Sequence, residues 1–273
     1  GVALPSVEPR ATEHIPQMID MIHRLIDKGH AYVAEGHVLF AVESFDDYGS
    51  LSGRDLAEMK AGARIEISDF KRHPGDFVLW KPSQDPQPGW DSPWGWGRPG
   101  WHLECSVMSE HHLGDSIDIH GGGQDLVFPH HENEIAQVEA ATEKTFARHW
   151  FHIAHLMVEG KKMSKSLGNL HTLEELDQKG YLAQEVRYVL LSGSYRQPLN
   201  FTFDSMNAAR KALSKLSDFA TRFEFKPASG EKLEVEFGPF YPVQEALLND
   251  LNTPEALGRC FRLIRELNEA FER

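Results

Sequence analysis

The stretch SIDIHGGGQDLVFPHHENEIAQVEAAT, residues 116–142, is the most informative part of this chain for its architecture. It predicts a strand that ends in three glycines, followed by a helix from about residue 129 to 142. The segment HWFHIAHLMV, residues 149–158, predicts a second strand after this helix. Strand, helix and strand in that order are typical of the βαβ unit of a parallel sheet, so we expect an α/β fold.

The segments on either side predict smaller elements. Apolar residues recur at helical spacing over 14–28, and AYVAEGHVLFAV predicts a hairpin with its turn near Glu35 and Gly36. Residues 82–100 are rich in Pro, Gly and Trp, which favours an ordered loop. From residue 172 onward the periodicity is mostly helical, so the C-terminal third is predicted to be a helical bundle. Its last helix begins at a cap provided by Asn252 or Thr253.

Composition excludes several classes of protein. The 273 residues contain no long apolar run, which argues against a membrane span, and no export signal is recognisable, so we expect a cytoplasmic protein with Cys105 and Cys260 reduced. The net charge of −13 argues against a broad surface that coats nucleic acid, because phosphate binding needs clustered Lys and Arg. Any contact with RNA is therefore expected to be local.

His130 and Glu134 lie one helical turn apart in PHHENEIAQ, so they share one face of the predicted helix. Their ring nitrogen and carboxylate oxygen can meet at one cation, whereas the neighbouring His131 is expected to point elsewhere. Cys105 is a plausible third ligand of Zn²⁺. The alternative is a simple hydrogen bond at a helix start. Three protein ligands would leave a position open for exchange, as in catalytic rather than structural zinc sites.

Two loops are candidates for ligand binding. Gly121, Gly122 and Gly123 allow close approach of a ligand at the end of a strand, although a tight turn would also explain them. The loop Lys161-Lys162-Met163-Ser164-Lys165-Ser166 carries several ammonium groups, which suits the charge of a triphosphate; the alternative is a solvated basic turn. Trp101 lies four residues before Cys105.

The motifs GRPGWHLECSVM, DIHGGGQDLVFPHHENEIAQ and GKKMSKSLGN resemble those of the cysteinyl-tRNA synthetases, a family of class I aminoacyl-tRNA synthetases. VEPRATEHIPQMIDMI, YGSLSGR, DFVLWKPS, YRQPLNFT and LLNDLNTPEALGRCFRLIRELN extend the resemblance through nearly the whole chain. It implies a partial Rossmann-type parallel sheet with an inserted α+β subdomain and a C-terminal helical bundle. The implied parts are the insertion (1–90), the second Rossmann half with the zinc site (91–160), the signature-loop region (161–203) and the start of an anticodon-binding bundle (204–273).

The resemblance also implies a reaction and its site: activation of cysteine with ATP and Mg²⁺, and transfer to tRNA-Cys. Cys105, His130 and Glu134 match three of the four ligands of a Zn²⁺ that binds the substrate thiolate. Trp101 and His120 match positions that line the cysteine pocket. Gly121 and Gly122 are expected to contact the nucleotide. Further nucleotide contacts are expected from the signature loop, which consists of Lys162, Met163, Ser164, Lys165 and Ser166. Within this loop Lys162 and Lys165 would be catalytic, and Lys165 would stabilise the α-phosphate and the departing pyrophosphate.

One departure from the family pattern is large. Family members begin with a first Rossmann half that carries a cysteine as fourth zinc ligand and the HIGH signature, whereas these residues contain no H-x-G-H sequence and no cysteine before Cys105. We therefore expect this chain to be a fragment, or one piece of a split enzyme whose partner is a separate N-terminal half-domain. Alone, the chain should be inactive, and its affinity for zinc should be weakened. The alternatives are a non-catalytic paralogue that binds tRNA or protein, and an ATP-dependent ligase that joins cysteine to a small amine.

Overall fold

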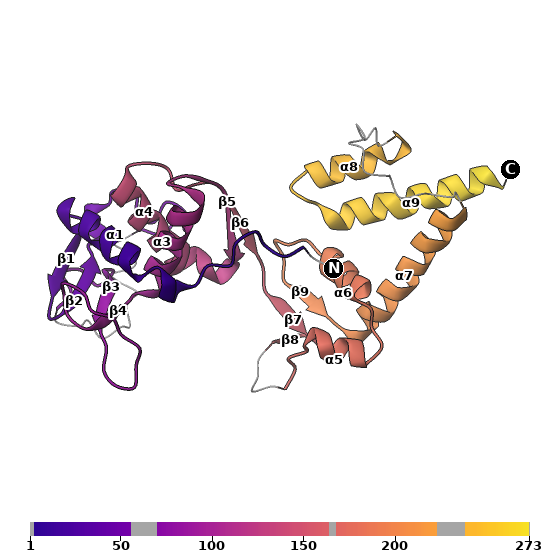
Figure 1. Cartoon of the computed structure of the whole chain (residues 1–273). Helices are drawn as coiled ribbons and strands as arrows, with labels where there is room; N and C mark the ends of the chain where they lie inside the picture. The colour runs from indigo at the N-terminus through magenta and orange to yellow at the C-terminus, as the bar shows by residue number, and fades with distance from the viewer. Residues whose placement is uncertain (1–2, 56–69, 164–167, 223–237, 273) are drawn as a thin grey trace. The chain divides into compact units, whose positions relative to one another are not determined.

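The strand–helix–strand order that the sequence predicts is present in the computed structural model. Strand β5 (Ile117–Gly123), helix α4 (Glu132–Thr142) and strand β6 (Ala147–Ile153) follow one another, and β5 pairs with β6 in a two-stranded sheet. The structure describes residues 3–55, 70–163, 168–222 and 238–272. They form two units, residues 4–152 and residues 153–273 with 1–3 (Figure 1). The predicted α/β class is confirmed.

The unit of residues 4–152 contains a four-stranded antiparallel sheet. Its order is β1 (Ala31–Ala34), β2 (His37–Phe40), β3 (Phe77–Pro82) and β4 (Gly97–Pro99), and β1 and β2 form the predicted hairpin. Helices α1 (Ile15–Asp27) and α3 (Trp101–Leu113) share one hydrophobic core with this sheet and α4. Short helical turns cover Ala11–Glu13 (η1), Val42–Ser44 (η2) and Gln124–Leu126 (η3).

Helix α1 confirms the amphipathic pattern read from the sequence. It buries one apolar face, made of Ile15, Met18, Met21, Ile22 and Leu25. On its other side, Arg24 donates two hydrogen bonds of 2.8 and 2.7 Å to the Glu110 carboxylate of α3. Gly29, with a φ of +82°, follows the helix, as left-handed glycines commonly do. Burial and a bidentate ion pair therefore fix α1 against α3.

The helix predicted from residue 129 begins later, at Glu132. A π-type turn, η4 (Val127–His131), precedes it, and Phe128 within this turn has an extended backbone with φ −141° and ψ 131°. The reason is Pro129, because a proline disfavours helical angles at the residue before it. His130 therefore lies in the turn, and His131 is the residue directly before the helix that carries Glu134.

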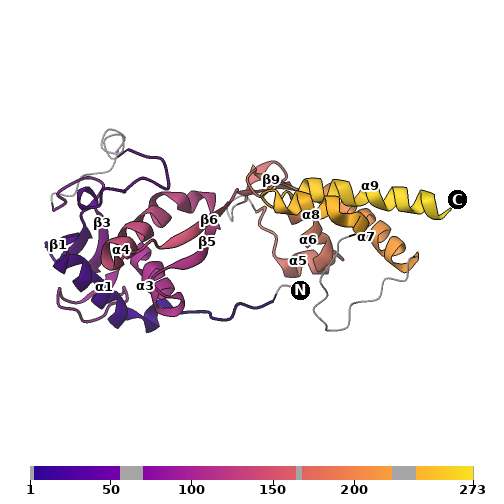
Figure 2. The same cartoon turned by 90° about the horizontal axis from the view of Figure 1, so that it is seen from above.

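The unit of residues 153–273 contains a small mixed sheet and six helical segments within the described ranges. Strand β7 (Leu156–Val158) pairs antiparallel with β8 (Lys161–Lys162) and parallel with β9 (Leu199–Phe201). The helical segments are α5 (Leu173–Gln178), α6 (Ala183–Leu191), α7 (Phe203–Arg222), η6 (Gly238–Phe240), α8 (Tyr241–Leu248) and α9 (Thr253–Phe271). Helices α8 and α9 lie side by side (Figure 2). Asn252 accepts a hydrogen bond from the backbone N–H of Glu255, which confirms the predicted cap.

Three element predictions need correction. The strand predicted over 149–158 is two strands, β6 and β7, which belong to different sheets; between them the Ala154 N–H donates to the Tyr195 carbonyl. The loop predicted over 82–100 contains β4, and the signature loop begins with β8, because both segments complete a neighbouring strand's backbone hydrogen bonds.

The four-part domain division remains a prediction. In the part of the chain that the structure describes, no helix is long and apolar enough to cross a membrane.

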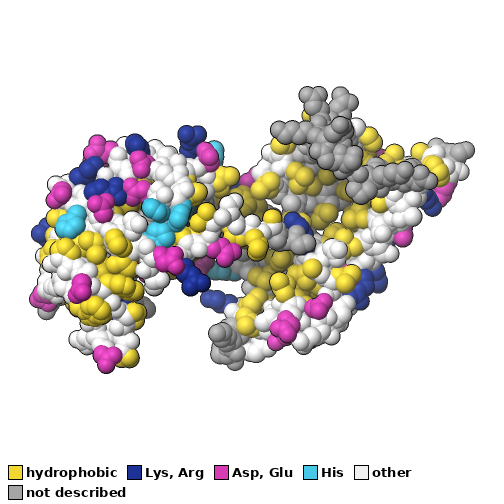
Figure 3. Space-filling model, in the orientation of Figure 1, with side chains coloured by type: hydrophobic (Ala, Val, Ile, Leu, Met, Phe, Trp, Pro, Cys, Tyr) yellow, Lys and Arg dark blue, Asp and Glu magenta, His cyan; other side chains and the backbone are white. Residues whose placement is uncertain are grey.

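Charged side chains of both signs are mixed on the face shown in Figure 3. On the face shown in Figure 3, Lys and Arg side chains are scattered among acidic ones rather than gathered in one broad basic area. This distribution agrees with the net charge of −13.

Candidate functional site

Cys105, His130 and Glu134 meet in the unit of residues 4–152. One ligand atom of each lies within 4.8 Å of the others. Cys105 comes from α3, His130 from the π-type turn and Glu134 from the first turn of α4. The structure thus brings together a thiol, an imidazole and a carboxylate, a donor set that Zn²⁺ favours.

Glu134 is the centre of this group. Its side chain is fully buried, and its two carboxylate oxygens lie 2.7 Å from His130 Nε2 and 2.7 Å from His120 Nε2. Burial by itself would raise the pKa of this carboxyl, but the contacts with His120 and His130 outweigh it and lower the pKa to about 2. Glu134 is therefore ionised, and a buried anion faces the space that Cys105 and His130 share.

The pKa of Cys105 shifts in the opposite direction to that of Glu134. Burial is the largest cause, with the nearby Glu134 and Glu104 carboxylates adding to it, and the pKa of the thiol rises to about 12. The thiol is therefore protonated unless a cation offsets the negative charges. The arrangement suits a residue that becomes a thiolate only when a metal binds.

His102, which is not among the site residues predicted from the sequence, orients His130. The Nδ1 atoms of the two rings lie 2.8 Å apart. Burial, reinforced by His130, lowers the pKa of His102 to about 4, so its ring is neutral at pH 7. His102 precedes Cys105 by three residues on α3, and this helical spacing is the signal that could have revealed it.

His131 does not point away, as expected, but toward the same carboxylate. Its ring nitrogen, one of His120 and an oxygen of Glu134 lie within 4.8 Å of one another. The cause is the π-type turn, which changes the phase of the chain before α4, so that both adjacent histidines are buried. His131 Nδ1 also lies 2.7 Å from His152 Nε2 on β6.

The three glycines end strand β5 and do not form a tight turn. A Cβ atom on Gly122 would lie 2.9 Å from Cε1 of the His131 ring, and one on Gly121 would lie 3.2 Å from the Phe151 carbonyl oxygen. Gly122 is thus needed for the packing of the histidine against the strand.

The start of α4 is anchored to the YGSLSGR segment. The buried Glu132 carboxylate accepts hydrogen bonds of 2.9 and 2.8 Å from the backbone N–H groups of Gly49 and Ser52. Tyr48 donates a 2.6 Å hydrogen bond to the Asn133 side chain. These bonds hold the helix that presents Glu134.

A cavity of about 500 Å³ opens onto these side chains. Its lining includes Cys105, His120, Gly121, His130 and Glu134, and Ser6, Val7 and Pro9 from the N-terminal segment complete one side. The Trp101 ring stacks on His130 with centroids 4.2 Å apart and is 57% exposed. A small molecule in this cavity would face the thiol, the imidazole and the carboxylate together.

The predicted nucleotide-binding loop begins in the other unit. Lys162 is exposed on β8, and Met163 packs against the core of Val158, Leu176 and Val189. Ser164, Lys165 and Ser166 lie outside the described residues.

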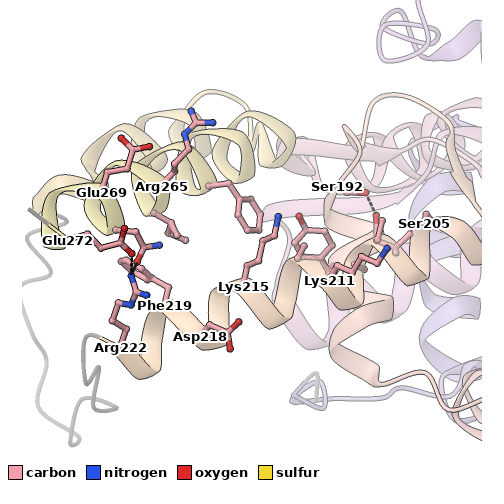
Figure 4. Close-up of a pocket in the computed structure, with 18 residues that line it drawn as sticks. Ser192, Ser205, Lys211, Lys215, Asp218, Phe219, Arg222, Arg265, Glu269 and Glu272 are labelled. Carbon is pink, nitrogen blue, oxygen red and sulfur yellow. Dashed lines mark hydrogen bonds and ion pairs between the residues drawn. The ribbon is translucent and has the colours of Figure 1, made fainter.

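A groove of about 1000 Å³ runs along α6, α7 and α9. Figure 4 shows Lys215 extending from α7 toward α9, and Arg222 at one end of the groove, where it donates a 2.9 Å hydrogen bond to Asn268. Lys211 and Arg265 also line it, among apolar side chains such as Phe219 and Phe261. Asp218, Glu269 and Glu272 line it as well, so the groove combines cationic, acidic and apolar side chains.

The sequence matches two known families. Residues 1–211 match the tRNA synthetases class I (C) catalytic domain, and residues 242–272 match the DALR domain. The cysteine--tRNA ligase of Maricaulis maris is 52% identical over 271 residues, and that of Paramagnetospirillum magneticum is 55% identical over 268. These matches cover 99% and 98% of this chain, which spans 57% of the length of either relative.

Solved structures share the fold. Methionyl-tRNA synthetase from Mycobacterium tuberculosis, in complex with methionyl-adenylate, matches with a TM-score of 0.63 at 15% identity, over 98% of this chain and 66% of that chain. A putative arginyl-tRNA synthetase from Campylobacter jejuni matches with a TM-score of 0.52 at 14% identity, over 95% of this chain and 55% of that one.

Proposed function

Because the chain belongs to the family of class I (C) tRNA synthetase catalytic domains, we propose that it serves the ATP-dependent activation of cysteine and its transfer to tRNA-Cys. The observation that carries this proposal is the convergence of Cys105, His130 and Glu134 on one point beside a cavity. Relatives that match nearly the whole chain and are named cysteine--tRNA ligase support the choice of substrate.

Zn²⁺ fits the donor set of this site. Thiolate sulfur, imidazole nitrogen and carboxylate oxygen are its usual protein ligands, and Cys105, His130 and Glu134 supply one of each. When bound, the ion would take the cysteine side chain as a thiolate and so favour it over the hydroxyl of serine. A position left open by three protein ligands would admit that side chain.

The chain's own residues would prepare this site. His102 holds the His130 ring from its Nδ1 side, which leaves Nε2 directed at Glu134. His120 contacts the second oxygen of Glu134 and lines the cavity, so it can orient the carboxylate and contact the substrate. Trp101, stacked on His130, would cover the bound amino acid. Polar groups fixed by such contacts need little reorganisation on binding.

For the nucleotide, we propose that Lys162, Met163, Ser164, Lys165 and Ser166 bind ATP with Mg²⁺, with Lys162 and Lys165 stabilising the transferred phosphate. Support comes from the GKKMSKSLGN sequence within the matched catalytic domain. Gly121 lines the cavity beside the metal ligands and is proposed, with Gly122, to contact the adenylate.

For the acceptor, we propose tRNA-Cys bound in part by the helical segments after residue 203. The match of residues 242–272 to the DALR domain, an anticodon-binding domain, favours tRNA over a small amine. Lys211, Lys215 and Arg265 beside the α6–α7–α9 groove are cations suited to phosphate. A separate polypeptide that supplies the rest of the family's length is a proposed partner.

The metal proposal is tested by zinc analysis of the purified chain after dialysis. We expect retained zinc in the wild type and at least about 10-fold weaker binding in Cys105→Ala, Glu134→Ala and, through loss of orientation, His102→Phe. His149→Gln, a change at an exposed histidine on β6, is the matched control. If Cys105→Ala and Glu134→Ala both retained as much zinc as the wild type, the site assignment would be wrong.

The catalytic proposal is tested by cysteine-dependent ATP–pyrophosphate exchange. The chain is assayed alone and with the segment of the Maricaulis maris relative that this chain does not match. We expect exchange only with both polypeptides, and a large loss in Lys162→Ala. Exchange that proceeds equally with serine, or none under either condition, would count against the proposed reaction.

A further inference from the structure

A second group of histidines lies away from the site described above. His14, His111 and His112 each offer a ring nitrogen, and these atoms lie within 4.8 Å of one another. His14 is the residue before α1, and the other two belong to the last turn of α3. Packing of α1 on α3 thus joins positions about a hundred residues apart in the sequence into one cluster.

The rings of this histidine cluster pack in T-shaped pairs, edge to face. Their centroids are 5.2, 5.0 and 4.8 Å apart, and the planes of the three pairs make angles of 75°, 66° and 83°. In this near-perpendicular packing, one ring nitrogen of each histidine still lies within 4.8 Å of the other two. Imidazoles that share one metal ion must each present a lone pair to the same point, so their nitrogens have to lie this close together.

His14 is held in the form that can act as a ligand. Its Nδ1 atom donates a hydrogen bond of 2.8 Å to the Arg10 carbonyl, so its Nε2 atom carries the free lone pair. Metal-binding histidines in proteins nearly always donate their second ring N–H to such a carbonyl, carboxylate or water. The side chain is buried, with 5% of the residue exposed, so its orientation is fixed in advance.

His112 presents its nitrogen to the same point. Its Nε2 atom lies 2.9 Å from Nε2 of His14. Two nitrogens bound to one tetrahedral ion at about 2.0–2.1 Å lie roughly 3.3 Å apart, so a small rotation would admit the ion. Without an ion, the His112 Nε2–H donates a hydrogen bond to the unprotonated Nε2 of His14.

The position also favours positive charge. His111 and His112 lie at the C-terminal end of α3, where the unpaired carbonyl groups make the helix end negative. Both side chains are exposed, so an ion could enter from solvent without opening the core.

We propose that His14, His111 and His112 form a second metal site, which takes a divalent transition-metal ion such as Zn²⁺, Ni²⁺, Co²⁺ or Cu²⁺ through three imidazole nitrogens. Imidazole suits these ions, whereas Mg²⁺ and Ca²⁺ prefer oxygen ligands. With three protein ligands, the ion keeps a position for water or an exchangeable ligand. His112 also lines the cavity that contains Cys105, so this ion would lie at the cavity's rim.

Cobalt distinguishes this site from the one that contains Cys105. The full chain is freed of metal with a chelator and titrated with Co²⁺, while bound metal is measured by equilibrium dialysis and the absorption spectrum is recorded. A thiolate ligand adds a sulfur-to-cobalt charge-transfer band, whereas three imidazoles give only d–d bands. The band therefore reports the proposed zinc centre separately, and no enzymatic activity is needed.

The variants are His111→Gln with His112→Gln, Cys105→Ser with Glu134→Gln, and His149→Gln as control. We expect the variant with His111→Gln and His112→Gln to bind one equivalent of Co²⁺ fewer but to keep the charge-transfer band. The variant with Cys105→Ser and Glu134→Gln should lose the charge-transfer band but still bind one equivalent of Co²⁺ that shows d–d bands. Each single change, His111→Gln or His112→Gln, should lower the affinity of the histidine cluster for Co²⁺ at least about 10-fold. These two histidines are exposed, so a normal far-UV circular dichroism spectrum is expected. If the first variant bound as much Co²⁺ as the wild type, or if the second bound none, the proposal would be wrong.

Discussion

At the scale of single residues, Gly122 shows how closely the candidate site is packed. A methyl group there would lie 2.9 Å from both His131 Cε1 and Leu126 Cδ1. His131 cannot easily give way, because it is buried and contacts His152 at 2.7 Å. The glycine therefore determines where the histidine, and the turn that carries it, can lie.

Gly122→Ala should lower the free energy of unfolding of the 4–152 unit by about 1–3 kcal/mol, the usual cost of overpacking. Its matched control is Gly258→Ala in α9, where a methyl group would meet nothing within 4 Å. That change should be neutral or stabilise the chain by up to about 1 kcal/mol, since alanine favours helices. Urea unfolding measures both. Equal effects of the two changes would refute the packing argument.

The proposed metal-binding residues could be identified from the sequence, but the residues that support them could be identified only in part. His130 and Glu134 were identified by one-turn spacing, which survives because the π-type turn joins α4 directly. The contact between His102 and His130 depends on how α3 packs on α4, which no local pattern encodes. The same turn brings His131 inward, and only its cause, the proline at position 129, is visible in the sequence.

At the scale of elements, one ion pair joins α6 to α7. Arg210 donates hydrogen bonds of 2.6 and 3.1 Å to Glu185, whose side chain is only 3% exposed. The Glu185 carboxylate also accepts a 2.9 Å hydrogen bond from the Leu182 N–H at the start of α6. One buried carboxylate thus caps a helix and binds its neighbour.

This pair predicts a dependence of stability on pH. The hydrogen bond from Arg210 is the largest cause that lowers the pKa of Glu185 in the folded chain. Stabilisation by the ionised carboxylate is therefore complete above its unfolded pKa of about 4.3, and is lost as the pH falls through the lower folded pKa. In Glu185→Gln, unfolding free energy at pH 7 should drop by about 1–3 kcal/mol.

The loss of stability on acidification should also be smaller in Glu185→Gln than in the wild type. Urea unfolding, followed by far-UV circular dichroism at several pH values, measures both effects. Glu174→Gln, at an exposed position on α5, is the control and should follow the wild type. An unchanged pH dependence in Glu185→Gln would show that the pair contributes nothing.

Elements with a complete local pattern were predicted well, and short strands were not. Helix α1 has both an apolar face and a terminal glycine, so its range was foreseen within a residue or two. Strands β6 and β7 were read as one because an apolar run does not reveal that its halves pair with different strands. Strands β4 and β8, of three and two residues, exist only through their partners.

At the scale of the whole molecule, the residues that the structure describes form two separate hydrophobic cores. One lies within residues 4–152, and the other is built around Val158, Phe201 and Met206. All six tryptophans belong to the first unit, at positions 80, 90, 94, 96, 101 and 150. Tryptophan fluorescence therefore reports on one unit, whereas far-UV circular dichroism reports on both.

We expect the two units to unfold in separate transitions, because each buries its own core. Each site occupied by Zn²⁺ at about 100 times its dissociation constant should stabilise the 4–152 unit by about 2.7 kcal/mol, which raises the fluorescence transition by roughly 5–10 °C per site. Arg210→Ala should instead lower only the second transition, seen by circular dichroism. Cys105→Ser with Glu134→Gln and His111→Gln with His112→Gln, combined, should abolish the zinc shift. A zinc shift of equal size in both transitions, or a fluorescence transition lowered by Arg210→Ala, would mean that the chain unfolds as one cooperative body.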